Sequence, residues 1–131
     1  PVLIKRGIFP RLHAAADDKE VGIAIRVATA NVSVVDLTAE LGKTVTAAQV
    51  NDAFREAATG RLKGILDATD EELVSVDFNG NPHSSVVDLP STAVVDGNLV
   101  KVLAWYDNEI GYTNRLLELA AKVGHGLGRA A

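Results

Sequence analysis

Apolar and β-branched runs, separated by glycine, proline and small polar residues, predict a chain dominated by strands. The clearest run is Leu99–Tyr106, in which only Lys101 interrupts an apolar sequence, as expected for a largely buried strand. Asp107 and Asn108 follow with side chains that cap helices, and Glu109 places a carboxylate where the helix dipole favours it. We therefore expect a strand that passes directly into a helix, at a junction where backbone dipoles and polar groups are available to a ligand.

Two segments have the apolar spacing of amphipathic helices. In the first, Thr46 and Gln49 match a capping box, apolar residues follow at helical spacing, and Gly60 is expected to end the helix. The second is expected to run from about Glu109 to Val123, and its apolar stripe consists of Leu116, Leu119, Ala120 and Val123. A further capping-box match at Thr69–Glu72 predicts a single helical turn.

Shorter segments are predicted as strands because β-branched and aromatic residues recur in them between turn residues. They are Val21–Val27, Asn31–Leu41, Lys63–Leu66, Leu73–Phe78, Ser85–Asp88 and Thr92–Val95. Pro90 separates the last two, and Asp96-Gly97 is a hairpin dipeptide. Because strands outnumber helices and their connections are short, we expect an α+β fold. It consists of a mixed, mostly antiparallel sheet with two main helices packed on one face.

Length and composition favour one soluble globular domain. The chain has 131 residues, 47% hydrophobic and 23% charged, enough to bury about two-thirds of its unfolded surface. The net charge of −4 argues against binding nucleic acid or an anionic membrane, and no apolar run approaches the roughly 20 residues that span a bilayer. With no secretion signal visible, we expect a cytoplasmic protein. We divide the chain into an N-terminal arm (1–20), a domain (21–123) and a flexible C-terminal tail (124–131).

Three stretches, in order along the chain, resemble one enzyme family. The junction at Trp105–Arg115 reads WYDNEIGYTNR, and far upstream Ile25–Thr38 reads IRVATANVSVVDLT. Between them lies a middle stretch made up of Leu62–Leu66, Val76–Asn79 and His83–Ser85. Together they are similar to the C-terminal catalytic domain of phosphorylating glyceraldehyde-3-phosphate dehydrogenases and of the related erythrose-4-phosphate dehydrogenases. The first twenty residues do not share this resemblance.

The resemblance implies an NAD-dependent dehydrogenase of sugar-phosphate aldehydes, with roles for three residues. Arg26 matches an arginine that binds substrate or inorganic phosphate, which suits the planar donor fork of a guanidinium. Asn108 matches the asparagine that binds the nicotinamide amide, and Tyr112 lines the same ring pocket. Structural interpretations stand beside these roles. Arg26 would pair with a carboxylate such as Asp36, Asn108 would be a helix cap, and Tyr112 would be a half-buried core aromatic.

The family's chemistry needs groups that this sequence does not contain. The family uses a Cys thiolate as nucleophile, and the chain has no Cys. His83 follows a turn proline and does not occupy the position of the family's catalytic His. No glycine-rich phosphate loop follows a strand, and no set of residues has metal-ligand spacing. We therefore assign no catalytic or metal-binding residue, and we expect the chain alone to be inactive and to bind NAD at most weakly.

More than one interpretation of the whole chain is open. It is either a partial catalytic domain or a non-enzymatic engineered or structural module whose role is self-assembly. The absence of Cys and Met, with Pro1 at the start, favours an excised, rebuilt or designed segment. In the family the final helix packs on the dinucleotide-binding domain. Here its apolar stripe predicts packing on its own sheet, a homo-oligomer, or cover by a missing dinucleotide-binding half. A third interpretation is a phosphate or sugar-phosphate binder that uses Arg26.

Overall fold

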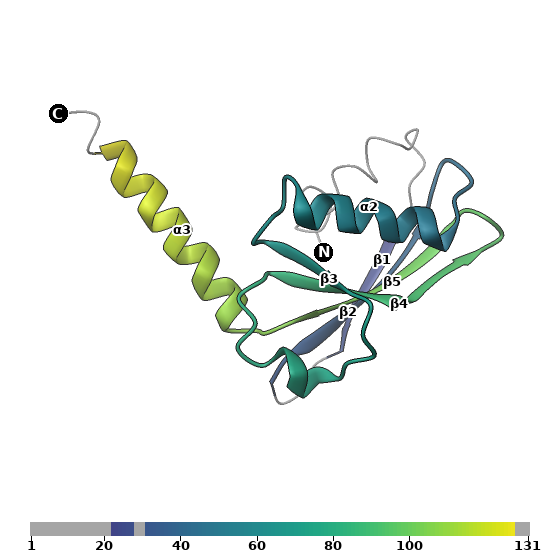
Figure 1. Cartoon of the computed structure of the whole chain (residues 1–131), viewed down its shortest axis with the longest axis horizontal. Helices are drawn as coiled ribbons and strands as arrows, with labels where there is room; N and C mark the ends of the chain where they lie inside the picture. Colours follow the sequence, from purple (N-terminus) through teal and green to yellow (C-terminus); the bar gives the residue numbers. More distant parts are fainter. Residues whose placement is uncertain (1–21, 28–30, 128–131) are drawn as a thin grey trace.

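The computed structural model describes residues 22–27 and 31–127 and places their strands in one five-stranded sheet (Figure 1). The elements are β1 (Gly22–Val27), β2 (Ser33–Glu40), α2 (Ala47–Thr59), β3 (Leu66–Thr69), the 3₁₀ helix η2 (Ser75–Phe78), β4 (Ser85–Val95), β5 (Leu99–Tyr106) and α3 (Ile110–Leu127). The strand order is β1-β2-β5-β4-β3, and only the β3–β4 pair is parallel. The predicted α+β class, with a mixed, mostly antiparallel sheet and two main helices, is confirmed.

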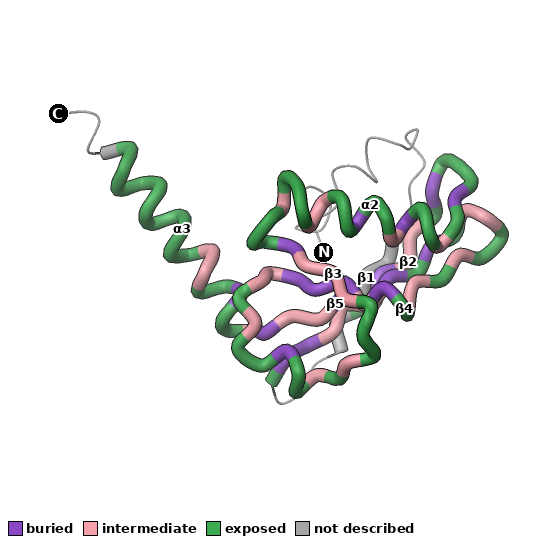
Figure 2. The backbone as a smooth tube through the Cα atoms, viewed as in Figure 1, coloured by how far each residue is buried: buried purple, intermediate pink, exposed green. Residues whose placement is uncertain are grey.

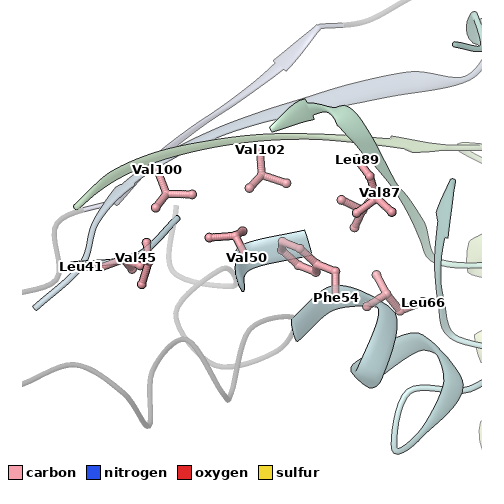
Figure 3. Close-up of a cluster of buried hydrophobic side chains, with 9 residues drawn as sticks. All are labelled: Leu41, Val45, Val50, Phe54, Leu66, Val87, Leu89, Val100 and Val102. Atoms are coloured by element: carbon pink, nitrogen blue, oxygen red, sulfur yellow. The ribbon is translucent and has the colours of Figure 1, made fainter. Parts of the chain in front are cut away.

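Helix α2 covers one face of the sheet and forms the main core with it (Figure 1). The helix begins as predicted, because Thr46 Oγ1 accepts the N–H of Gln49 at 3.2 Å and the Gln49 side chain accepts the N–H of Thr46 at 2.9 Å. Val50 and Phe54, one turn apart, point towards the strands. Figure 3 shows the buried cluster, which consists of Leu41, Val45, Val50, Phe54, Leu66, Val87, Leu89, Val100 and Val102.

The opposite face of the sheet carries a smaller core beside η2. Phe78 stacks on Trp105 with ring centroids 5.6 Å apart, and Val32 and Val86 complete the buried cluster. Val86 and its neighbour Val87 belong to different cores, because successive side chains of a strand point to opposite faces. Trp105, the last residue but one of β5, is therefore packed against η2 just before the chain turns into α3.

Helix α3 does not pack on the sheet, which corrects our expectation that both helices lie on one face. It projects away from the sheet (Figure 1), and Figure 2 shows it exposed along most of its length. Four apolar side chains of α3 are 51–63% exposed: Leu116, Leu117, Leu119 and Val123. Only residues 107–109 separate β5 from α3, and this short link directs the helix outward. The apolar stripe therefore has no cover among the described residues.

Strand β4 is continuous, whereas the sequence predicted two strands separated by Pro90. Its pairing with β5 shifts register between Asp88 and Ala93, and Pro90 lies within this irregular stretch. A proline has no N–H to donate to a neighbouring strand. Where the pairing is irregular no such donor is needed, so the strand continues past Pro90. The hairpin before β5 is as predicted, with φ angles of 51° at Asp96 and 79° at Gly97.

Two short segments between α2 and η2 differ from their predicted structure. β3 begins where the predicted strand Lys63–Leu66 ends, because Gly64, with a φ of 77°, turns the chain there. The helical turn predicted at Thr69–Glu72 is absent from the structure. Instead, the Thr69 hydroxyl accepts the N–H of Glu71 at 3.1 Å and closes a local turn.

The 3₁₀ helix η2 replaces the strand that we predicted for Leu73–Phe78. Asp77 Oδ2 accepts the N–H of Val74 at 2.8 Å, which stabilises the 3₁₀ turn. Val74 and Val76 are exposed, and Phe78 is buried. The β-prone residues of this segment therefore form a turn that inserts one aromatic side chain under the sheet.

The ends of the predicted domain lie at the limits of the described residues. Helix α3 continues through Gly124 and Gly126 to Leu127, so residues 124–127 are helical where we expected a flexible tail. Glycine lowers helix propensity by about 1 kcal/mol but retains its N–H donor, so it does not by itself stop a helix. The predicted arm over 1–20 and the last four residues lie outside the described part of the chain.

Candidate functional site

The candidate site is the junction at which β5 passes into α3. β5 ends at Tyr106 and α3 begins at Ile110, within one residue of the prediction. Oδ1 of Asp107 accepts the backbone N–H groups of Glu109 and Ile110 at 2.9 and 3.0 Å, which caps the helix. Its Oδ2 accepts the N–H of Gly80 at 2.9 Å. One carboxylate therefore joins the start of α3 to the loop that follows η2.

The Asp107 side chain is a buried charge, with the residue 3% exposed. Hydrogen bonds from the N–H groups of Ile110 and Gly80 lower the pKa of this carboxyl, and bonds from Glu109 and Asn31 act in the same direction. Burial opposes them, but the pKa still lies below its ordinary value. The carboxylate is therefore ionised at neutral pH, beside the positive end of the α3 dipole.

Asn108 lies inside the turn that Asp107 closes. Its Oδ1 atom is buried and has no hydrogen-bond partner among the residues that the structure describes. An unsatisfied buried acceptor costs about 1–3 kcal/mol, so this oxygen would gain from a hydrogen-bond donor, and the atoms that cover it must move before a ligand reaches it. A carboxamide N–H is a donor of the required kind. The helix cap is Asp107 and not Asn108, so the structural interpretation of Asn108 as the cap is wrong.

Tyr112 is on the first turn of α3 and is 68% exposed. It is therefore not the half-buried core aromatic of the structural interpretation. Its ring is available to form the wall of a pocket that a further group completes. Tyr112 follows Asn108 by four residues, so both belong to the same junction.

Two contacts fix the first turns of α3 beside the chain that leads into β4. Gly111 lies against the backbone of His83 and Ser84, so closely that a Cβ atom on it would be 2.7 Å from the His83 carbonyl oxygen. Arg115 Nη1 donates to the carbonyl oxygen of Gly64 at 3.1 Å and to Ser84 Oγ at 3.3 Å. One face of the first turns of α3 is therefore attached to the segments that lead into β3 and β4.

Arg26 lies near the same end of the sheet as the junction, where β1 and β5 both finish. It pairs with Val35 next to the end of β1, and Val35 in turn pairs with Ala104 of β5. β1 and β5 are both antiparallel to β2, so they run in the same direction and their C-terminal ends lie at the same end of the sheet. Asp36, the alternative partner that the sequence offered for Arg26, forms an ion pair with Lys101 at 3.0 Å.

Sequence reasoning missed most of what fixes this junction. Asp107 had a signal, because an aspartate between a strand and a helix is a typical N-cap. No sequence signal indicated that its second oxygen would accept the N–H of Gly80. Gly111 contacts His83, and Arg115 contacts Gly64 and Ser84. These contacts join segments that are far apart in the chain. A single sequence contains no pattern that indicates such pairs.

Other candidate chemistry is limited in the described part of the chain. His83 Nδ1 lies 2.9 Å from Asn81 Oδ1 in the loop before β4, so this histidine is bonded within its own turn. The described His, Asp and Glu side chains form no group of three that could bind a metal ion. Neither helix within residues 22–27 and 31–127 combines the length and apolar character needed to cross a membrane.

Comparisons with known proteins identify the family of the chain. Residues 6–108 match the family described as "Glyceraldehyde 3-phosphate dehydrogenase, C-terminal domain". This match includes most of the segment 1–20, which we expected to differ from the family. Glyceraldehyde-3-phosphate dehydrogenase 1 of Bacillus cereus is 60% identical over 100 residues, which are 76% of this chain and 30% of that protein.

Two further relatives give the same result. Glyceraldehyde-3-phosphate dehydrogenase 1 of Bacillus subtilis is 58% identical over 102 residues, and the Geobacillus stearothermophilus dehydrogenase is 57% identical over 102 residues. Each alignment covers 78% of this chain, and the chain spans about 30% of the length of these curated relatives. With a family match over most of its length, the chain belongs to the glyceraldehyde-3-phosphate dehydrogenase family, as a segment of its C-terminal domain.

Proposed function

We propose that this chain forms the part of a phosphorylating dehydrogenase's catalytic domain that contacts the nicotinamide ring of NAD and the phosphate of an aldose-phosphate substrate. The supporting observation is Asn108 Oδ1, which is buried and unpaired among the described residues at the junction. In the proposed complex this oxygen accepts a hydrogen bond from the nicotinamide carboxamide and so selects one orientation of the ring. The exposed Tyr112 ring forms one wall of the pocket. Bound NAD supplies the hydride acceptor.

The phosphate contact in this proposal is Arg26. Arg26 lies near the C-terminal end of β1, at the same end of the sheet as the junction. This position supports the assignment. A guanidinium binds a phosphate through two parallel N–H donors, which orients the substrate as well as attracting it. Arg26 and Asn108 together would align the aldehyde carbon with the nicotinamide ring. The nucleophile is not among these groups, because the sequence contains no Cys.

Titration of the ¹⁵N-labelled chain with NAD, followed by NMR, tests the nicotinamide contact. We expect weak binding that shifts the side-chain amide signals of Asn108. We expect Asn108→Ala to weaken this binding about two- to tenfold, the effect of one lost hydrogen bond. Asn98→Ala, an equivalent truncation at the hairpin before β5, is the control and should bind NAD normally. Equal NAD affinity of the Asn108→Ala and Asn98→Ala variants would contradict the proposal.

A second assay addresses the activity of the chain alone. With NAD, phosphate and either glyceraldehyde 3-phosphate or erythrose 4-phosphate, we expect no turnover, because acyl transfer needs a thiolate that the chain lacks. Glyceraldehyde-3-phosphate dehydrogenase 1 of Bacillus subtilis serves as the active control. Measurable turnover by the chain would show that this part of the proposal is wrong.

The second candidate function is a structural module that self-assembles through α3. It is favoured by the apolar stripe of α3, since side chains such as Leu117 and Leu119 are 63% and 58% exposed. Burying a leucine is worth about 1.5–3 kcal/mol, so several exposed leucines on one helix favour a partner. The partner is a second copy of the chain under this candidate. Under the first candidate it is a dinucleotide-binding domain.

Light scattering at low and high protein concentration distinguishes the two candidates. Self-assembly predicts a mass that rises to a multiple of the monomer and returns to the monomer in Leu119→Glu. Val76→Glu is the matched control, because Val76 is 63% exposed on η2, away from α3. A strict monomer at high concentration rules out the self-assembling module and leaves the first candidate unchanged.

A further inference from the structure

We infer that Asp107 is a positioning residue for the nicotinamide contact: its buried carboxylate fixes the backbone at Asn108 and thereby keeps Oδ1 of Asn108 in place for a carboxamide. The inference rests on the proposed function, because the carboxamide is the ligand proposed for Asn108. Asp107 touches no proposed ligand itself. It acts through the turn that contains Asn108.

The geometry of the turn supports this role. Asp107 Oδ1 accepts the N–H groups of both Glu109 and Ile110, so its hydrogen bonds close a loop of chain around Asn108. Such a turn restricts the backbone dihedrals of the enclosed residue. The direction in which the Asn108 side chain leaves the backbone is thereby fixed. The amide oxygen then does not need to be ordered when a ligand arrives.

The second oxygen of Asp107 ties the turn to the body of the molecule. Oδ2 accepts the N–H of Gly80, and the Asn31 side chain also hydrogen-bonds to the carboxylate. Asn31 Nδ2 in addition donates to Asn79 Oδ1 at 2.8 Å. The start of β2, the loop after η2 and the start of α3 therefore meet at one carboxylate. A helix cap alone would need only the bonds to α3.

The burial of this group argues for a specific role. Asp107 is 3% exposed, whereas a capping oxygen on a surface helix normally remains in contact with water. Hydrogen bonds from backbone N–H groups to an ionised carboxylate are about twice as strong as neutral ones. Loss of the carboxylate therefore loosens the turn, because no other described side chain supplies an acceptor to the N–H of Gly80 or Ile110.

The test uses the full, isotope-labelled chain of 131 residues. Without ligand, ³J couplings give the χ1 rotamer populations of Asn108, and hydrogen exchange gives the protection of the Glu109 and Ile110 amides. In the unaltered chain we expect one dominant rotamer. In Asp107→Ala we expect several rotamers, faster amide exchange, and NAD binding weakened about two- to tenfold, the penalty for ordering one side chain on binding.

Two controls separate positioning from a general loss of stability. Val50→Ala destabilises the core under α2 without touching the junction, and it should leave the Asn108 rotamer unchanged. Asp77→Ala removes a carboxylate that caps a backbone N–H on η2, and it should also leave Asn108 unchanged. If Asp107→Ala does not fold, Asp107→Asn decides instead. The Asp107→Asn variant keeps one acceptor oxygen for the turn. One Asn108 rotamer should then dominate more than in Asp107→Ala and less than in the unaltered chain.

A folded Asp107→Ala or Asp107→Asn variant whose Asn108 rotamer matches the unaltered chain overturns the inference. A change of the same size in Val50→Ala also overturns it, because the effect would then follow stability and not position. If NAD shifts no Asn108 signal in the unaltered chain, the proposed function fails. The ligand-free rotamer populations still decide the role of Asp107, so the two failures are distinguishable.

Discussion

Gly111 brings the backbone of α3 close to the chain that precedes β4. A Cβ atom placed on it would lie 2.7 Å from the carbonyl oxygen of His83 and 3.4 Å from Cα of Ser84. Carbon and oxygen do not approach to 2.7 Å without displacement, and here the neighbour is backbone, which cannot rotate away. The contact therefore needs a residue without a side chain, although Gly111 is within a helix, where glycine is otherwise unfavourable.

We expect Gly111→Ala to lower the free energy of unfolding by about 1–3 kcal/mol, the usual cost of forcing a methyl group into a closely packed contact. Gly124→Ala is the matched control on the same helix, because a Cβ at Gly124 meets no atom within 4 Å. That variant should keep the unfolding midpoint and increase the helical circular dichroism signal. Urea denaturation of both variants measures the difference, and equal midpoints would contradict the packing argument.

The residues of the site show how far sequence reasoning reaches at this scale. Asn108 and Tyr112 were predicted as site residues because the local motif after β5 resembles that of the family, and their roles stay predictions. The structural interpretations were wrong for both, since the capping carboxylate is Asp107 and Tyr112 is exposed. Burial of Asp107 and its bond to Gly80 depend on where a distant loop lies. No property of Asp107 or its neighbours indicates that position.

Among the elements, the link between β5 and α3 depends on the charge of one carboxylate, so it is expected to respond to acid. The pKa of Asp107 in the folded chain lies below the ordinary value of 3.8, chiefly through the hydrogen bond from the Ile110 N–H. Between these two pKa values the unfolded chain binds a proton that the folded chain does not bind. The stabilisation is therefore complete above the unfolded pKa and is lost as pH falls through the folded pKa.

The comparison of the unaltered chain with Asp107→Asn tests this dependence. We expect the difference in unfolding free energy between them to be constant above about pH 5 and to shrink as the pH is lowered towards 2. Val50→Ala, which removes no titratable group, should differ from the unaltered chain by an amount that does not change with pH. A constant difference for Asp107→Asn across the range would show that the charge of Asp107 does not stabilise the junction.

Elements were predicted well where a local signal determines them. The capping box of α2 and the continuous apolar run of β5 gave their bounds almost to the residue. The segment 63–78 was predicted poorly, because its turns depend on single hydrogen bonds from Thr69 and Asp77 that compete with strand formation. The continuity of β4 past Pro90 was missed for a different reason, since only the pairing with β5 reveals the register shift.

At the scale of the whole molecule, the sheet and α2 form a self-contained core, and α3 stands apart from it (Figure 1). The apolar stripe of α3 was evident from the sequence, and so was its need for cover. The sequence did not reveal that the helix leaves the sheet, because that direction is set by the contacts of Asp107, Gly111 and Arg115 at the first turns. The sequence predicted the α+β class but not the exposed position of this helix.

The attachment of α3 at one end has a mechanical consequence. Its 18 residues extend about 27 Å at 1.5 Å per residue, and its described contacts with other elements lie within the first two turns. A rotation of about 10° at residues 107–109 would therefore carry the far end through about 5 Å. The contacts of Gly111 and Arg115 therefore decide where the unattached part of the helix, out to His125, comes to lie.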